Sequence, residues 1–391
     1  MKRIVVLVVW LLLGYSGAGS PKLFAGSATF FDLPGEASLN EGAGWGDALY
    51  LTLRLSESQE LLFMVDTGSD GTILDQSLDA QLGEKFEPTI LNDSSTGRML
   101  KVQKYIAPRL SLGKTRLLTG EFVATLDLTH IRSALGRPVM GILGMDCLEN
   151  YCIQLDFDAG KIRFLDPAHP CDESLGREFP LTITSAGRYM VRGNLLGVGG
   201  VDSEIDTGET FTGRLEPKLF DGAIRDNRTS ADAKGVARFS GVHATRTGRF
   251  PECVFGKETY RDLILDESVP TAIGLRFLAR HLVTFNYPRM KLYLKRRTRE
   301  FPVDEDNMSG LSVAKKGQAT VVQSVDKGCG ANQAGLRVSD VIRQVNGRPV
   351  DRMELWQLRK LFRSGDGEEI GITVQRGGEM KQFRTVLKRR I

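Results

Sequence analysis

Two short stretches of this 391-residue chain decide its fold: Met64–Ser69 (MVDTGS) and Glu204–Glu209 (EIDTGE). Each contains an Asp-Thr-Gly tripeptide, with the aspartates at positions 66 and 206, 140 residues apart. From average residue usage, this tripeptide is expected only about 0.1 to 0.2 times in a chain of this length. Two copies therefore indicate an internal repeat.

A second pair of matched stretches supports the repeat. GILG at 141–144 and AIG at 272–274 are each followed by a short apolar helix pattern and by alternating strands that end in KIRF at 161–164 and KLYL at 291–294. We expect the glycines at 144 and 274 to let the chain pass close behind each Asp-Thr-Gly turn.

The two halves are therefore interpreted as one unit present twice, at residues 25–168 and 174–298. Each unit reads as short alternating strands joined by Gly, Asn and Asp turns, with one short helix after the GILG or AIG stretch. The sequence thus predicts a mainly β protein with two related lobes.

Residues 303–391 form a third unit with a different pattern. The charged stretch 295–300 before it is interpreted as a solvated linker. Asp351, with Glu354 three residues later, predicts a capping box for a helix with apolar residues between 353 and 362. Strand patterns at 319–325, 340–345, 369–376 and 382–387 surround this helix.

The N-terminus has the order of a signal peptide: Lys2 and Arg3, an apolar run from Ile4 to Leu13, and small residues up to Ala18. We predict that residues 1–18 are a signal peptide and that the chain is exported. The apolar run is about half of what a membrane-spanning helix needs. A retained membrane tether is therefore the alternative.

The composition, with 41% hydrophobic and 26% charged residues, is that of a folded globular protein. A net charge of +4 without a concentrated basic face argues against a nucleic-acid partner. Four His and five Cys form no cluster at metal-ligand spacing, so we expect no metal or other cofactor. Export would permit one disulfide among Cys147, Cys152 and Cys171, with Cys171 as the favoured partner.

An aspartate beside a glycine on a tight turn has little steric cover and can face a ligand. If the two lobes bring Asp66 and Asp206 together, their like charges cannot both ionise comfortably, and the pair holds one proton. One carboxylate can then accept a proton from water while the other donates to a carbonyl. The repeat therefore predicts acid/base hydrolysis without a covalent intermediate.

These motifs resemble those of pepsin-like and retropepsin-like aspartic proteases over roughly residues 28–295. The resemblance implies a catalytic dyad of Asp66 and Asp206 and an endopeptidase that acts on peptides or proteins. It implies a supporting set around the dyad, in which the threonines bond across the lobes and the serine bonds the outer oxygen of its aspartate: Thr67, Gly68, Ser69, Thr207 and Gly208.

Glu209 departs from the family pattern, which has Ser, Thr or Ala at that position. If its side chain points inward, we expect it to raise the upper apparent pKa of the dyad. The resemblance also implies a mobile hairpin over the substrate, with strands at 89–91 and 98–105 and a polar turn that includes Ser95, Thr96 and Gly97. The short lobes resemble a dimeric retropepsin fused into one chain.

The third unit resembles a bacterial-type PDZ domain, on the evidence of SGLSV at 309–313, AGLRVSDVI at 334–342 and VNG at 345–347. The resemblance implies a groove for a peptide or protein C-terminus. The implied groove residues are Gly310, Leu311, Ser312, Val313 and Leu358. The alternative is a domain that only docks against the two lobes.

Together these features predict an exported, monomeric, two-lobed aspartic endopeptidase with a C-terminal PDZ domain, and the resemblance favours a bacterial periplasm or the cell exterior. One alternative is a catalytically inactive scaffold that binds extended peptides. Another is a homodimer of first lobes, in which the second lobe is only structural and Asp206 is dispensable.

Overall fold

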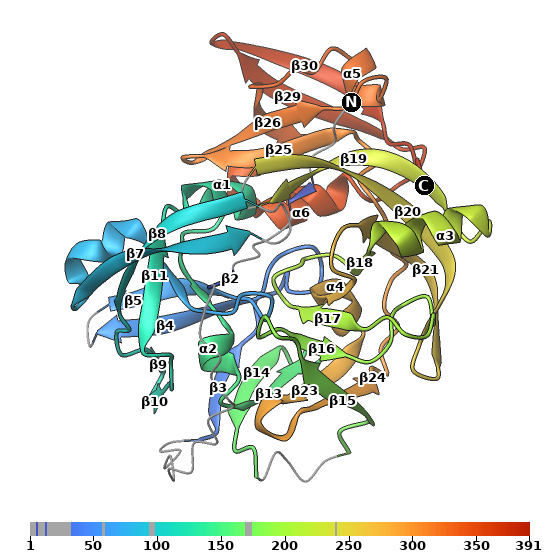
Figure 1. Cartoon of the computed structure of the whole chain (residues 1–391). Coiled ribbons are helices and arrows are strands. Elements are labelled where there is room, and N and C mark those ends of the chain that lie inside the picture. Colours follow the sequence, from blue (N-terminus) through green and yellow to red (C-terminus); the bar gives the residue numbers. More distant parts are fainter. Residues whose placement is uncertain are drawn as a thin grey trace.

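The computed structural model describes residues 5–6, 12–13, 33–56, 59–93, 98–168, 174–238 and 241–391. It confirms a mainly β architecture: two lobes lie side by side, and a third domain sits above them (Figure 1). The Asp-Thr-Gly turns lie where the two lobes meet.

The first lobe consists of β3 (Gly35–Ser38), β4 (Tyr50–Ser56), β5 (Gln59–Val65), β6 (Ile73–Asp75), η1 (Gln76–Gln81), β7 (Lys85–Asp93), β8 (Arg98–Ile106), β9 (Ser111–Leu112), β10 (Thr115–Arg116), β11 (Phe122–Leu126), α1 (Thr129–Leu135), β12 (Val139–Leu143), α2 (Met145–Leu148), β13 (Cys152–Asp156) and β14 (Lys161–Leu165). The second lobe consists of β15 (Arg177–Ile183), β16 (Tyr189–Val191), β17 (Ser203–Asp206), β18 (Gly213–Leu215), α3 (Pro217–Arg225), β19 (Ser230–Arg238), β20 (Gly241–Phe255), β21 (Glu258–Glu267), β22 (Ala272–Gly274), α4 (Leu275–Leu278), β23 (His281–Asn286), η2 (Tyr287–Arg289) and β24 (Lys291–Arg296).

The same strand topology surrounds both Asp-Thr-Gly turns. β5 pairs in parallel with β12, and β12 pairs antiparallel with β6. In the second lobe, β17 pairs in parallel with β22, and β22 pairs antiparallel with β18. A Cβ added to Gly144 would lie 2.4 Å from the carbonyl oxygen of Gly71, and one added to Gly274 would lie 2.3 Å from that of Phe211. Both positions therefore need glycine, as the sequence predicted.

The lobes are joined by a shared sheet. Its strand order is β15-β24-β23-β13-β14-β3, so three strands of the second lobe are followed by three strands of the first lobe. At the seam, β13 pairs antiparallel with β23, with Ile153 opposite Phe285. Both side chains are buried, in one apolar core that extends through both lobes. The sheet therefore fixes the two Asp-Thr-Gly turns relative to one another.

The prediction of one short helix per lobe was incomplete. The short helices α2 and α4 follow the glycines as expected, but η1 and α1 in the first lobe and α3 in the second were not predicted. α3 begins at Pro217, which suits the first turn of a helix because its missing N–H has no intrahelical partner there. Helices α1 and α3 occur in stretches of mixed polarity, where the apolar periodicity is short.

The third domain consists of β25 (Leu311–Lys316), β26 (Ala319–Val325), α5 (Gly330–Gln333), β27 (Val341–Val345), β28 (Arg348–Pro349), η3 (Val350–Arg352), α6 (Leu355–Leu361), β29 (Glu369–Arg376) and β30 (Glu379–Val386). The predicted helix exists, but its start was wrong. Asp351 lies in η3, and Met353 is extended, so the helix cannot continue from there. The capping box is instead formed by Glu354 and Gln357.

The stretch before the third domain is not a solvated linker throughout. β24 extends to Arg296, and the Phe301 ring stacks on Trp45 of the first lobe with 4.8 Å between ring centroids. Asp304 is buried. Apolar and ionic contacts therefore hold this segment against the lobes, which charge content alone did not indicate.

Two strands precede the first lobe: β1 (Val5–Val6), which pairs with β19, and β2 (Leu12–Leu13), which pairs with β7. The remaining residues of the predicted signal peptide lie outside the described ranges, and cleavage after Ala18 stays a prediction. None of the helices in the described part of the chain is long and apolar enough to cross a membrane. Cys147 and Cys152 are buried, whereas Cys171 lies outside the described residues, so the expected bridge is untested.

Candidate active site

Asp66 follows β5 and Asp206 ends β17, and both aspartates are buried where the lobes meet. A Cβ on Gly208 would lie 2.4 Å from Oδ1 of Asp66, and a Cβ on Gly68 would lie 2.8 Å from Oδ1 of Asp206. Each carboxyl group therefore lies against the glycine of the opposite turn. The two predicted catalytic residues and these two glycines come together in one site.

The two threonines hold the turns together with four hydrogen bonds across the lobes. Thr67 N donates to Thr207 Oγ1 at 3.0 Å, and Thr207 N donates to Thr67 Oγ1 at 3.0 Å. The hydroxyl of Thr67 donates to the carbonyl of Ile205 at 2.8 Å, and that of Thr207 to Val65 at 3.0 Å. Every donor and acceptor in this set is buried, so the geometry of the dyad depends on both threonines.

The surroundings of Asp66 perturb its ionisation. Burial, and then the neighbouring Asp206 carboxylate, raise the pKa of Asp66 well above its ordinary value. The backbone N–H of Gly68 donates to Asp66 Oδ1 at 2.8 Å and partly offsets this effect. A buried carboxyl that keeps its proton beside a second carboxylate is what general acid/base chemistry needs.

Ser69 does not have the contact that the resemblance implied. Its hydroxyl donates to the carbonyl of Gly71 at 2.8 Å, within the turn, and not to a carboxylate oxygen of Asp66. The turn folds back toward β6 immediately after Ser69, and this brings the Gly71 carbonyl closest to the hydroxyl. Ser69 therefore supports the shape of the turn.

Glu209 points inward and is fully buried, but it faces a cation that the sequence analysis did not consider. Its carboxylate forms a buried ion pair with Arg214, which also donates to Asp206 Oδ2 at 3.0 Å. The backbone N–H of Glu209 donates to Asp206 Oδ1 at 3.1 Å. The guanidinium offsets the negative charge of Glu209, so our expectation of an uncompensated carboxylate beside the dyad omitted its main partner.

Sequence reasoning missed Arg214 because a single arginine on a short strand reads as a surface residue. A signal was nevertheless present. Arg214 stands eight residues after Asp206, and the residue eight positions after Asp66 is Leu74, which is buried. A charged residue at a position whose repeat counterpart is a core leucine indicates a specific buried partner.

The predicted hairpin over the site is formed by β7 and β8, which pair antiparallel. Its turn residues Ser95, Thr96 and Gly97 lie outside the described residues. A second hairpin, β19–β20, occupies the equivalent place in the second lobe, after α3. In Figure 1 the two hairpins approach from the two lobes below the third domain. The sequence analysis did not predict the second hairpin.

The five predicted groove residues of the third domain (Gly310, Leu311, Ser312, Val313 and Leu358) are all buried. β25 is an edge strand, which in a PDZ groove would pair with a peptide. Here that edge faces helix α1 of the first lobe. Ser133 Oγ donates to the carbonyl of Lys315 at 2.5 Å, and Arg359 of α6 donates to the carbonyls of Ala134 and Val313 at 2.6 and 3.0 Å.

Two further contacts close the groove between β25 and α6. Arg137, which follows α1, pairs with Glu354 at 2.9 Å. Leu355 lies so close to Gly136 that an added Cβ would be 2.7 Å from its Cδ1 atom. Helix α1 and the turn after it therefore lie against the open edge of β25 and the start of α6.

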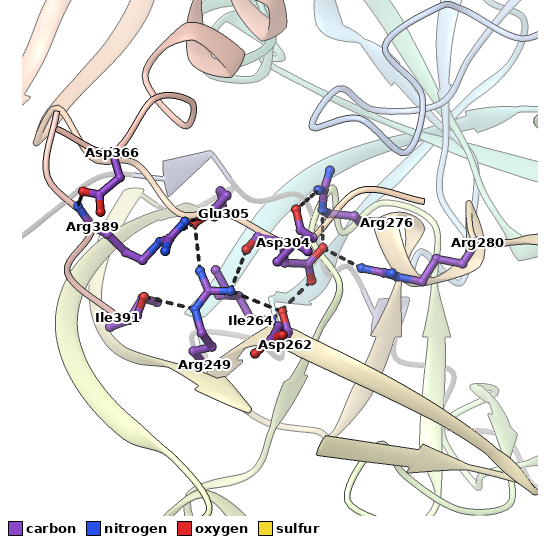
Figure 2. A network of polar contacts seen from close by, with 11 residues as sticks. Arg249, Asp262, Ile264, Arg276, Arg280, Asp304, Glu305, Asp366, Arg389 and Ile391 are labelled. Carbon is purple, nitrogen blue, oxygen red and sulfur yellow. Dashed lines mark hydrogen bonds and ion pairs between the residues drawn. The ribbon is translucent and has the colours of Figure 1, made fainter. Parts of the chain in front are cut away.

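A second contact between the third domain and the lobes involves Asp304 (Figure 2). Its carboxylate pairs with Arg276 and Arg280, each at 2.7 Å, and accepts hydrogen bonds from Ile264 N and Thr212. Thr212 belongs to the loop that begins at Asp206. Although burial opposes ionisation, the two arginines hold the pKa of Asp304 below its ordinary value.

The neighbouring Glu305 extends this network, as Figure 2 shows. Glu305 pairs with Arg249 of β20 at 2.9 Å and also with Arg389 near the chain end. Arg249 donates to the carbonyls of Asp304 and Ile391. Within the described ranges, no cluster of three or more His, Cys, Asp or Glu residues has the arrangement of a metal site.

Comparison with known families agrees with this site. A family model described as an aspartyl protease matches residues 51–147, and a model described as a PDZ domain matches residues 321–376. The chain therefore contains a retropepsin-like aspartyl protease domain and a PDZ domain, which confirms the resemblance drawn from the motifs. The first match includes Asp66 but not Asp206. The two domains support the assignment of the protein as a peptidase.

The individual relatives are partial. The chain is 37% identical over 75 residues to a probable CtpA-like serine protease of Staphylococcus aureus, strains COL and N315, and this covers 19% of the chain and 15% of each relative. Basic 7S globulin from soybean matches 67% of the chain and 94% of its own, with 14% identity and a TM-score of 0.43. Conglutin gamma from lupine seeds matches 68% and 95%, with 12% identity and a TM-score of 0.41. With TM-scores this low, the two globulins add nothing to the assignment.

Proposed function

We propose that the protein is an aspartic endopeptidase that hydrolyses peptide bonds with a water activated between Asp66 and Asp206. The observation that carries the proposal is the buried pair of aspartates, each against the glycine of the other turn, on two turns joined by the Thr67–Thr207 hydrogen bonds. The two hairpins β7–β8 and β19–β20 can exclude water from a bound peptide.

The test is cleavage of a peptide library by the full chain at pH 3 to 8, with Asp66→Asn and Asp206→Asn as variants. We expect each variant to abolish cleavage and pepstatin to inhibit the wild type. Because the curated relatives are named serine proteases, a sulfonyl fluoride is the matched control and should leave activity intact. Cleavage that survives Asp206→Asn would favour the homodimer of first lobes, and peptide binding without cleavage would favour the scaffold.

We further propose that the PDZ domain binds a peptide or protein C-terminus only in exchange for helix α1. The proposal is supported by the contacts of Ser133 and Arg359 along the open edge of β25. Backbone pairing with a peptide needs the same edge. Binding would then loosen the contact between the third domain and the first lobe.

The compartment also belongs to the proposal. We propose that the chain is exported through its N-terminal segment to a bacterial periplasm or to the exterior and works as a monomer. Sequencing the N-terminus of the mature protein tests cleavage after Ala18. An intact N-terminus in the membrane fraction would support the tethered alternative.

A further inference from the structure

Arg214 is a fully buried cation beside the dyad, on the short strand β18. Removing a guanidinium from water costs several kcal/mol unless partners compensate it. Its Nη1 lies 3.0 Å from Asp206 Oδ2 and also bonds Glu209, its Nη2 lies 3.5 Å from Glu204 Oε2, and its Nε donates to the carbonyl of Pro270 at 2.8 Å.

These partners keep Arg214 charged. Burial alone would lower the pKa of Arg214, but the carboxylates of Glu209, Asp206 and Glu204 together raise it. Arg188 lies 3.7 Å from Glu204. Burial raises the pKa of Glu204 well above its ordinary value, the charges of Asp206 and Asp70 raise it further, and Arg214 and Arg188 partly offset this. The group around Arg214 therefore consists of the carboxyls of Asp66, Asp206, Glu204, Glu209 and Asp70 and the guanidinium of Arg188.

The two aspartates stand in unequal surroundings. Asp206 receives a charged N–H from Arg214 and a backbone N–H from Glu209. Asp66 receives the backbone N–H of Gly68, and its counterpart of Arg214 is the apolar Leu74. A charge-assisted bond favours the ionised form of the carboxyl that accepts it.

We propose that Arg214 is a positioning residue that holds Asp206 as the carboxylate and leaves the shared proton on Asp66. This inference rests on the proposed function, and it assigns the role of base to Asp206 and the role of acid to Asp66. Glu209 acts through Arg214. Its carboxylate holds the guanidinium against Asp206 and partly neutralises the positive charge of that guanidinium.

The assignment orders the proton transfers. Water attacks the peptide carbonyl carbon and gives one proton to Asp206, while Asp66 gives its proton to the carbonyl oxygen. When the C–N bond breaks, Asp206 protonates the leaving nitrogen, and a hydroxyl of the tetrahedral diol returns a proton to Asp66. The dyad ends with one proton on Asp66, as it began.

The pH dependence of kcat/KM tests the role of Arg214, because the acid limb reports the group that must be ionised. For Arg214→Met we expect this limb to move to higher pH by at least one unit, which lowers kcat/KM at least tenfold on the acid side. For Glu209→Gln we expect a shift to lower pH, because Arg214 then acts on Asp206 without competition. Arg214→Lys should restore the limb most of the way.

Arg188→Met is the matched control, because Arg188 is the second arginine of this group and pairs with Glu204. It should move the acid limb by less than half as much as Arg214→Met. Acid limbs that stay in place for both Arg214→Met and Glu209→Gln would show that the pair is only structural and would overturn the inference while the peptidase assignment stands.

A second readout does not depend on catalysis. Without Arg214, Asp206 and Glu209 lose the cation that they share, so the stability lost in Arg214→Met should be larger at pH 7, where carboxyl groups ionise, than at pH 3. An equal loss of stability at pH 3 and pH 7 would contradict the inference that Arg214 holds Asp206 as the carboxylate. If the wild type cleaves nothing, the proposed function fails, whereas an equal loss of stability at pH 3 and pH 7 contradicts the ion pairing of Arg214 with Asp206 and Glu209 whether or not the protein cleaves peptides.

Discussion

Asp66 combines burial with a neighbouring carboxylate, and this makes the proposed proton donor a source of instability as well. Its pKa is raised in the folded protein above the ordinary value of 3.8. The folded state therefore holds this proton more tightly than the unfolded state does. Stability from this group falls as pH rises from about 4 through the folded pKa, and the loss is complete above it.

We therefore expect Asp66→Asn to abolish cleavage and to raise the melting temperature at pH 7 by a few degrees. At pH 3 the gain should disappear, because Asp66 is protonated in both states. Asp127→Asn is the control, because Asp127 is 56% exposed and remote from the dyad. Thermal unfolding at the two pH values measures the effect, and a lower melting temperature for Asp66→Asn at pH 7 contradicts it.

At the scale of elements, the four threonine hydrogen bonds join two turns that belong to different lobes. Thr207→Val keeps the shape of the side chain but leaves Thr67 N and the Val65 carbonyl buried without their partner. We expect a loss of about 2 to 4 kcal/mol in unfolding free energy and a lower kcat. Thr52→Val, at an exposed position on β4, should change stability little. Urea unfolding of both variants provides the measurement.

Much of this element structure could be predicted from sequence, because the repeat carries it twice. The Asp-Thr-Gly turns, the glycines behind them and the short helices α2 and α4 follow from local patterns. The β19–β20 hairpin could not be predicted, because residues 230–249 lack apolar alternation and pair through backbone groups. The start of α6 was misplaced because Asp351 and Glu354 both satisfy the capping pattern, and only the extended Met353 separates them.

The candidate site could likewise be predicted only where its residues belong to a sequence motif. Both aspartates and the cross-lobe threonines carry a motif, whereas Arg214, Asp304 and the Ser133 contact depend on residues distant in sequence or on unusual burial. No local pattern shows which buried carboxylate a given arginine will meet. The acceptor of the Ser69 hydroxyl likewise depends on the path of the turn, which three residues of sequence do not determine.

At the scale of the whole molecule, Asp304 connects the third domain to the loop after Asp206. We expect Asp304→Ala to cost about 3 to 5 kcal/mol, because it leaves Arg276 and Arg280 largely buried without their counter-charge. It should also reduce kcat, since Thr212 loses its acceptor. Asp366→Ala, in the same network but on the exposed side, should cost about 1 kcal/mol. Denaturant unfolding of both variants would falsify this account if the costs were equal.

The contacts between helix α1 and the PDZ domain lead to a prediction about peptide binding. Arg359→Met removes the hydrogen bonds to Ala134 and Val313 but keeps a long side chain in place. We expect this variant to bind peptides with a free C-terminal carboxylate at least tenfold more tightly than the wild type does. Lys360→Met, the exposed neighbour on α6, should bind like the wild type. Fluorescence anisotropy with a labelled peptide library measures this, and equal affinities for all three proteins would contradict it.

The unequal halves have a consequence for how such an enzyme can arise. A homodimer is encoded once, so any substitution beside one aspartate appears beside the other as well. Two copies of the Glu209–Arg214 pair would make the surroundings of both aspartates alike, and neither would be favoured as the proton carrier. Joining the halves in one gene removes this constraint, because each half can then change alone. Leu74, at the position in the first half that corresponds to Arg214, is a divergence that a duplicated chain can keep and a homodimer cannot.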